Sequence, residues 1–347
     1  MKKGLLALGS LLTICLSMLA TDMVVKQKNG EDWKINVDDV EEVVFEESTA
    51  NDTTGVPLKF NIISDSTVEV AKSEDIYTYS EIIIPVKVII DDKEYIVTNI
   101  REKAFYNCSN LESIIIPEGV TSIGESAFEK CNSLTNINIP EGVMSIGYYA
   151  FLGCSSLKSI KIPKNVTTIN AYLFYDCSKL ESIEIHKDVT SIENYAFSGC
   201  SSLKNIEIPK SITEIGSYVF YGCTNLKSID IPECLTIIGN YAFYNCSTLT
   251  NINIPEGVTK IGYDAFSGCS SLTSINIPEK VTKIENNVFC RCSSLTSINI
   301  PESVTTIENY AFKNCEKLDV VIDNSEKNVK VGSKAFEGCK SVKWLKD

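Results

Sequence analysis

The sequence predicts a repeat solenoid, a mostly β fold in which short coils of chain stack along one axis. Two observations carry this prediction. Cysteines recur every 23 residues over most of the chain, and each has a phenylalanine three positions before it and a leucine three positions after it. One such coil cannot bury its own apolar edge, so coils stacked in register would share a continuous core. The repeat cysteines are Cys108, Cys131, Cys154, Cys177, Cys200, Cys223, Cys246, Cys269, Cys292 and Cys315, followed by Cys339 one residue later than the period.

The consensus of one coil is C-x-x-L-x-x-I-x-I-P-x-x-V-T-x-I-G-x-x-A-F-x-x-C. Its Ile-x-Ile segment alternates as a short strand does, and the proline that follows ends the strand because it has no amide hydrogen to donate. The Val-Thr-x-Ile segment indicates a second short extended stretch. A glycine then permits a tight turn, although Asn170, Glu193 and Glu285 replace it in some coils, so a positive φ is not strictly required there. The Ala-Phe-x-x-Cys segment has the spacing of one short helical turn facing the core.

Stacking of these coils predicts parallel strand ladders that run along the solenoid axis. At about 4.8 Å per coil, the eleven coils would form a rod on the order of 50 Å long. The last coil departs from the consensus, since Val320–Asp323 slips the strand pattern and an extra residue precedes Phe336. We expect Trp344 and Leu345 to close this end.

The repeat resembles the BspA-type leucine-rich repeat (LRR) family of bacterial surface proteins. The resemblance covers residues 101 to 339, where eleven units share Phe-x-x-Cys and most share Ile-Pro and Ala-Phe. It implies a leucine-rich-repeat solenoid that is exported and that attaches to host or neighbouring-cell molecules. It implies no catalytic residues.

The segments before the repeats divide into four parts. Residues 1–20 have the short positive start and apolar stretch of a signal peptide, and we do not expect Cys15 to be lipidated because Ile14 precedes it. Residues 21–47 predict a small acidic β-hairpin element with a turn at Asn29-Gly30, either docked on the solenoid or forming a separate anchoring module. Residues 48–55 are a polar linker, and residues 56–100 form an N-terminal cap with an inserted hairpin. The repeats and a C-terminal cap occupy residues 101–347.

The charge of the chain excludes some partners. The formal net charge is −13, and an acidic surface repels phosphate backbones, so we expect no nucleic-acid binding. No segment beyond the predicted signal peptide is long and apolar enough to cross a membrane, which leaves no transmembrane segment in the mature chain. The expected location is therefore exported, at the cell surface or outside the cell.

The sequence offers little material for catalysis. His186 is the only histidine, and it occupies a proline slot of the repeat, where a surface turn residue is expected. We find no catalytic residues, no metal ligands and no cofactor-binding motif, so the chain is not expected to be an enzyme. The repeat cysteines are interpreted as small buried hydrophobes rather than disulfide partners, whereas Cys234 and Cys290 fall outside the core positions.

Two outward stripes are candidates for binding a partner. The first is a mixed-charge band on the Ile-x-Ile strand, made of Lys158, Lys161, Glu181, Glu184, Lys204, Glu207, Lys227 and Asp230. The second is a tyrosine column in five consecutive coils, made of Tyr149, Tyr172, Tyr195, Tyr218 and Tyr241. Each stripe has a structural alternative, namely cross-strand ion pairs for the first and stacking between coils for the second. A ladder of outward threonines, from Thr167 to Thr305, is interpreted as structural.

These features predict a binding or adhesion scaffold for an extracellular protein or a cell-surface glycan. A solenoid presents a broad and shallow surface, which suits macromolecules better than small metabolites. The alternative is a passive structural spacer or matrix component without a specific ligand. We expect a partner to bind the middle of the solenoid, within residues 149–244, where the two stripes coincide.

Overall fold

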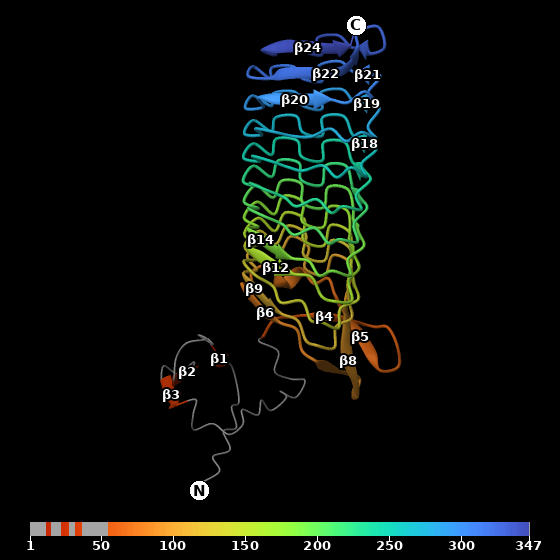
Figure 1. Cartoon of the computed structure of the whole chain (residues 1–347). Helices are drawn as coiled ribbons and strands as arrows, with labels where there is room; N and C mark the ends of the chain where they lie inside the picture. The colour runs from red at the N-terminus through yellow and green to blue at the C-terminus, as the bar shows by residue number, and fades with distance from the viewer. Residues whose placement is uncertain (1–11, 15–21, 28–31, 37–54, 347) are drawn as a thin grey trace.

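The computed structural model is a β-solenoid that describes residues 12–14, 22–27, 32–36 and 55–346 (Figure 1). Its coils stack in chain order from the cap to the C-terminus, so that neighbours in space are neighbours in sequence. The first described residues form a separate antiparallel sheet in the order β1-β2-β3, with β1 (Leu12–Ile14), β2 (Asp22–Gln27) and β3 (Asp32–Asn36). The predicted signal peptide lies outside the described residues except for β1.

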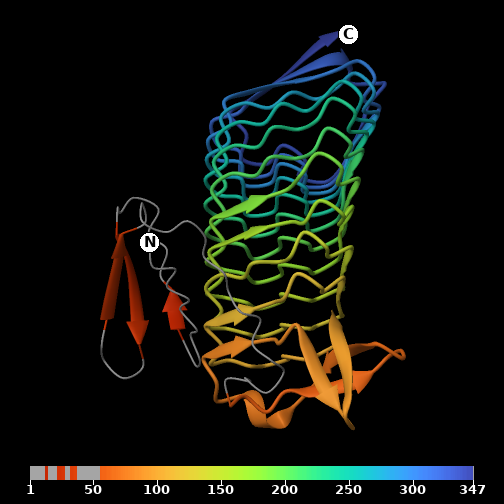
Figure 2. The ribbon, with the colours of Figure 1, turned by 90° about the horizontal axis from the view of Figure 1, so that it is seen from below.

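An N-terminal cap covers the first coil, at the end of the stack opposite to the C-terminus (Figure 2). It contains β4 (Lys59–Ile62), β5 (Thr67–Ala71), the short 3-10 helix η2 (Glu74–Ile76), β7 (Lys87–Ile90) and β8 (Lys93–Ile100). The predicted hairpin is formed by β7 and β8, which pair antiparallel. On its other edge β8 pairs parallel with β5, and β5 pairs with β4. These strands cover a sheet edge that would otherwise be open to pairing with another chain.

Two strand columns run along the solenoid, as the two extended segments of the repeat predict. The Ile-x-Ile column consists of β6 (Glu81–Ile83), β9 (Ser113–Ile115), β12 (Ser159–Lys161), β14 (Ser182–Glu184), β20 (Ser297–Ile300), β22 (Asp319–Ser325) and β24 (Ser341–Lys346). The Val-Thr-x-Ile column begins at the end of β8 and continues through β10 (Ser122–Ile123), β11 (Ser145–Ile146), β13 (Thr168–Ile169), β15 (Ser191–Ile192), β16 (Glu214–Ile215), β17 (Ile237–Ile238), β18 (Lys260–Ile261), β19 (Lys283–Ile284), β21 (Thr306–Ile307) and β23 (Lys330–Val331).

Pairing within both columns is parallel and, away from the two ends of the stack, follows the sequence period. Ser159 is opposite Ser182 in the first column, and Thr168 is opposite Ser191 in the second. Between β14 and β20 the Ile-x-Ile column has only isolated bridges, at Glu207–Asp230 and Asn251–Ser274. The predicted slip at the C-terminal end is confirmed, because Ser297 pairs with Asp319, one residue short of the period.

The short helical turns predicted for the Ala-Phe-x-x-Cys segments are wrong. Within residues 55–346 the only helical segment is η2, and the repeat coils contain successive turns instead. The amides of Ser126, Phe128 and Lys130 donate to carbonyl groups of the next coil at 2.9, 2.8 and 2.7 Å. Backbone hydrogen bonds that would build a helix are therefore used between coils, and this part of the repeat forms a third line of inter-coil bonds.

Two residues in each coil adopt a positive φ, the second before and the second after the repeat phenylalanine. In one coil these are Tyr195, with φ of 60°, and Gly199, with φ of 77°. A left-handed residue reverses the chain locally and interrupts any helical run. The consensus glycine has a different role: a Cβ atom on Gly239 would lie 2.5 Å from the backbone of Gly216, so close approach of the coils selects it.

The core is one continuous column of repeated side chains. The repeat phenylalanines stack face to face along the axis, for example Phe197 on Phe220 with ring centroids 5.7 Å apart and planes within 6°. The repeat cysteines from Cys108 to Cys315 are buried beside them, whereas Phe336 and Cys339 in the last coil are half-buried. At that end Trp344 packs against the core, but Leu345 is 51% exposed. The alternation of side chains along β24 turns Leu345 outward, so the prediction that it closes the coil is wrong.

Candidate functional site

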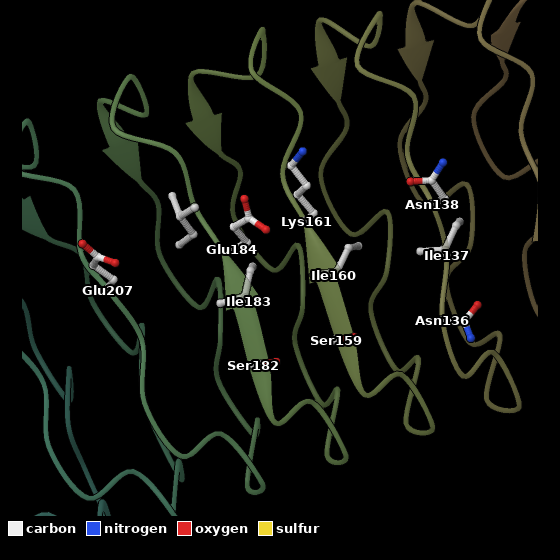
Figure 3. Close-up of a pocket in the computed structure, with 11 residues that line it drawn as sticks. Asn136, Ile137, Asn138, Ser159, Ile160, Lys161, Ser182, Ile183, Glu184 and Glu207 are labelled. Carbon is white, nitrogen blue, oxygen red and sulfur yellow. The ribbon is translucent and has the colours of Figure 1, made fainter. Parts of the chain in front are cut away.

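The charged band lies on the Ile-x-Ile face of the middle coils, with all eight side chains exposed. Lys161 belongs to β12 and Glu184 to β14, and the parallel register sets them directly opposite each other. Glu207 and Asp230 continue the same row through an isolated bridge. Figure 3 shows Lys161, Glu184 and Glu207 projecting from successive coils on one face. Period-two alternation of the strand keeps this row outward while the flanking isoleucines point into the core.

Only some of the charged side chains of the band form ion pairs. The Lys204 Nζ atom lies 2.5 Å from a Glu181 carboxylate oxygen, and this hydrogen bond lowers the pKa of Glu181. Lys161 pairs instead with Glu141, outside the band, at 2.5 Å. Among residues 55–346, Glu184, Glu207 and Asp230 form no ion pair, so three carboxylates in adjacent coils face solvent without a paired cation. The predicted structural alternative, a ladder of cross-strand pairs, therefore accounts for one part of the band only.

A shallow depression of about 560 Å³ lies within this face (Figure 3). Ser159 and Ser182 form its floor with short side chains, and it is also lined by Ile160, which is buried, and Ile183, which is half-buried. Its rim is polar and charged, with Asn138, Lys161, Glu184 and Glu207. The band thus combines unpaired charge with a hollow that a projecting group of a partner can enter.

The tyrosine column is a stack of rings. Tyr172 and Tyr195 have ring centroids 4.5 Å apart with planes within 7°, and Tyr195 and Tyr218 are 4.4 Å apart within 9°. The rings of Tyr149 and Tyr241 extend the stack at either end. Burial raises the pKa of Tyr172, Tyr195, Tyr218 and Tyr241. Because each inner ring has both of its faces covered by its two neighbours, these faces are not free to stack on a sugar, and only ring edges and hydroxyl groups reach the surface.

The threonine ladder is occupied by backbone contacts. The hydroxyl group of Thr236 donates to the carbonyl of Thr213 at 3.1 Å, and that of Thr259 donates to Thr236 at 3.3 Å. The donors are therefore used to join coils, which agrees with the structural interpretation of this ladder.

The remaining reactive groups are also held structurally. The His186 Nε2 atom lies 3.0 Å from the Val166 carbonyl, and its Nδ1 atom accepts from the Asp188 amide, so both ring nitrogens have backbone partners. The thirteen cysteines of residues 55–346 are free thiols, with Cys234 exposed and Cys290 half-buried. No group of three or more potential ligands that could hold a metal ion occurs in that range. Among the described residues, no helix has the length and apolar character needed to span a bilayer.

Sequence reasoning missed two features of this site. The partner of Lys161 is Glu141, which also accepts a hydrogen bond from the Lys164 amide and belongs to the turn of the preceding coil. The depression was not foreseen either. The row of outward positions beside the charged residues contains both asparagine and serine, and their order indicates where the depression lies. Serine has the smaller side chain, so only serine leaves room above the core.

The geometry defines an LRR-type solenoid, and comparison with known proteins gives its family. The family model described as "BspA type Leucine rich repeat region" matches residues 98–227 and 213–343. The chain belongs to this family. A search of curated proteins finds no match.

Solved structures agree with the family. A leucine-rich repeat protein from Bacteroides ovatus is 29% identical over 87% of this chain and 81% of that chain, with a TM-score of 0.67. A leucine-rich cell surface protein from Faecalibacterium prausnitzii is 26% identical over 83% of this chain and 93% of its own, with a TM-score of 0.56.

Proposed function

We propose that the chain is an exported scaffold that binds an extracellular protein or a cell-surface glycan through the charged band of its middle coils. The observation that carries the proposal is the coincidence of the depression with the unpaired carboxylates of Glu184 and Glu207, which Asp230 continues in the next coil. Unpaired surface charges favour a complementary partner and steer its approach. The tyrosine column is assigned a supporting role, since its ring faces are covered.

Location at the cell surface is part of the proposal. The signal-like residues 1–20 support it, as does the similarity to a solved leucine-rich cell surface protein. A non-catalytic role accords with the family and with the open form of the depression, because catalysis requires convergent ionisable groups in a sheltered pocket. Leucine-rich repeat proteins bind proteins, and a broad solenoid face suits that task.

A binding screen with charge variants tests this function. The purified chain is screened against immobilised extracellular matrix proteins and cell-surface glycans. For any ligand found, we expect a variant with Glu184 and Glu207 changed to Gln and Asp230 changed to Asn to lose about tenfold or more in affinity, a loss of about 1.4 kcal/mol or more, because the carboxylates that attract the partner are removed. Binding by the unchanged chain should also weaken as salt rises, because the contributing charges are exposed.

The matched control changes three exposed glutamates outside the band to Gln, namely Glu118, Glu233 and Glu279. It has the same net charge as the band variant, so a general effect of net charge would change the ligand affinity of both variants equally. A third variant changes Tyr172, Tyr195 and Tyr218 to Ser and asks whether the tyrosine column contacts the ligand. Equal affinities of the band variant and the unchanged chain, with both folded, would contradict the proposal. Absence of any ligand in the screen would favour the passive spacer.

A further inference from the structure

The Ile-x-Ile face contains a second depression, of about 540 Å³, near the C-terminal end of the solenoid. Ser274 and Ser297 form its floor, together with isoleucines of the same strands whose side chains are buried in the core. Asn253, Asn276 and Asn299 form its rim. All of its lining residues are asparagine, serine or isoleucine, so no ionisable side chain reaches it.

The two depressions are the same local structure repeated five coils apart. Asn136, Ser159 and Ser182 of the first correspond to Asn251, Ser274 and Ser297 of the second, each five sequence periods later. At about 4.8 Å per coil the two sites are about 24 Å apart. In the intervening coils this row contains Asn205, Ser228 and Asn251. Two adjacent serines after an asparagine therefore accompany both depressions.

The rims differ in charge at two corresponding positions. Lys161 of the first site is replaced by Asn276 in the second, and Glu184 is replaced by Asn299. The Asn276 side chain is fixed, because its Oδ1 atom accepts from the Ile254 amide at 2.9 Å and its Nδ2 atom donates to the Ile254 carbonyl at 2.7 Å. Within residues 55–346, no hydrogen bond engages the exposed amide groups of Asn253 and Asn299, so both are free to bind a ligand.

We propose that the second depression is a separate subsite for a neutral glycan chain. An asparagine amide offers both a donor and an acceptor, which suits the adjacent hydroxyl groups of a sugar. A charged ligand would lose hydration there without gaining a charged partner. The open form, which spans three coils or about 10 Å, admits a chain rather than a single enclosed metabolite.

This inference rests on the proposed function because it uses the same face of the solenoid for binding. It differs in assigning a distinct ligand class to a distinct pair of coils. The Asn253 and Asn299 amides are the ligand-binding groups. Asn276 is a positioning residue, because its side chain is hydrogen-bonded to the backbone of Ile254 in the preceding coil.

Isothermal titration of the full chain with neutral hexasaccharides of glucose, mannose, galactose and xylose tests the assignment. Sulfated and sialylated oligosaccharides serve as charged comparators. We expect at least one neutral hexasaccharide to bind and the double variant Asn253→Asp/Asn299→Asp to weaken its binding about tenfold or more, since two amide donors are lost. Aspartate has nearly the shape of asparagine and leaves the Asn276 contacts intact, so this variant should remain folded.

The repeat offers a reciprocal variant. Lys161→Asn/Glu184→Asn/Glu207→Gln gives the first depression the two rim asparagines of the second and removes its remaining charge, and we expect it to bind a second equivalent of the same hexasaccharide. If no neutral hexasaccharide binds, or if binding is unchanged in Asn253→Asp/Asn299→Asp, the assignment is wrong. The band variant of Glu184, Glu207 and Asp230 should retain neutral glycan binding, because its substitutions lie outside the second depression. Loss of band binding and loss of glycan binding are therefore separate results.

Discussion

The Cys200 side chain fills a fully buried position and donates its thiol hydrogen to the Phe174 carbonyl, with the sulfur 3.2 Å from the oxygen. The same contact recurs between the other repeat cysteines and the phenylalanine of the preceding coil, for example from Cys269 to Phe243 at 3.1 Å. The cysteine side chain is small and largely apolar, and its thiol is a weak hydrogen-bond donor. It therefore satisfies a carbonyl lone pair, and removing the thiol from water costs little free energy. Alanine would lose this contact, and serine would bury a more polar group.

Burial also makes these thiols poor acids, which has a consequence for stability. Burial raises the pKa of the Cys269 thiol from an ordinary value of 9.0 to about 12. Above pH 9 the unfolded chain therefore releases a proton that the folded chain keeps, so the free energy of unfolding should fall as pH rises. The expected slope is about 1.4 kcal/mol per pH unit for each such cysteine, up to the folded pKa.

Denaturant unfolding of the unchanged chain and of Cys269→Ala, measured between pH 7 and pH 11, checks this effect. The variant is expected to be the less stable of the two at pH 7, because it loses packing and the contact with Phe243. The stability difference should shrink above pH 9 as the unchanged chain loses its cysteine contribution. A difference that stays constant over the whole range would show that the thiol is not held protonated by the fold.

At the scale of elements, the sequence predicts what recurs with its period and misses what depends on backbone conformation. The period alone predicted both strand columns, their parallel register and the inward phenylalanines, because apolar side chains at fixed spacing have one way to share a core. It did not predict the turns around Tyr195 and Gly199. Tyrosine has no particular preference for a positive φ, so no residue type at that position identifies a left-handed conformation.

The tyrosine column therefore combines strain with stacking. Tyr195 has φ of 60° yet is held between Tyr172 and Tyr218, and rings in such stacks stabilise the fold. At the corresponding position of a later coil Asn287 has nearly the same φ, 57°. The column tolerates residues that accept the left-handed region and uses tyrosine where rings can stack.

This balance predicts an order of stability among substitutions of Tyr195. Tyr195→Asn loses the stacking but keeps a residue suited to a positive φ. Tyr195→Val loses the stacking and also places a β-branched residue in the left-handed region, where a side chain costs roughly 1–2 kcal/mol. We expect the valine variant to be the less stable by about that amount in urea melts. A valine variant as stable as the asparagine variant would contradict a left-handed Tyr195.

At the scale of the whole molecule, the candidate site follows from the stack of coils rather than from any one motif. The charged band could be predicted because identical outward positions align across coils. The depressions could not, since they depend on the size of neighbouring side chains in three coils and on how deeply the isoleucine tips lie beneath them. The ion pair between Lys161 and Glu141 could not be predicted either. Glu141 lies in the turn of the preceding coil, so the pair depends on the three-dimensional stack.

Because each coil contacts only its neighbours, a whole coil should be removable. Deletion of residues 210–232 joins Pro209 to Glu233, the next residue of an equivalent coil, and keeps both depressions complete. The stack would close in register, with its two binding sites about 4.8 Å nearer to each other. We expect circular dichroism like that of the full chain and a urea m-value lowered in proportion to the lost buried surface.

Deletion of residues 211–232 is the matched control, since it removes one residue fewer and joins Lys210 to Glu233. The extra residue must be absorbed where the strand alternates with a period of two, so either a bulge forms or the isoleucines of one coil turn toward solvent. The chain tolerates such a slip between β20 and β22, near its end, but in the middle every following coil depends on the pairing. The control should therefore unfold at a lower urea concentration than the whole-coil deletion. Equal midpoints for the two deletions would mean that coil register contributes little to stability, contrary to the continuous phenylalanine and cysteine column that the register aligns.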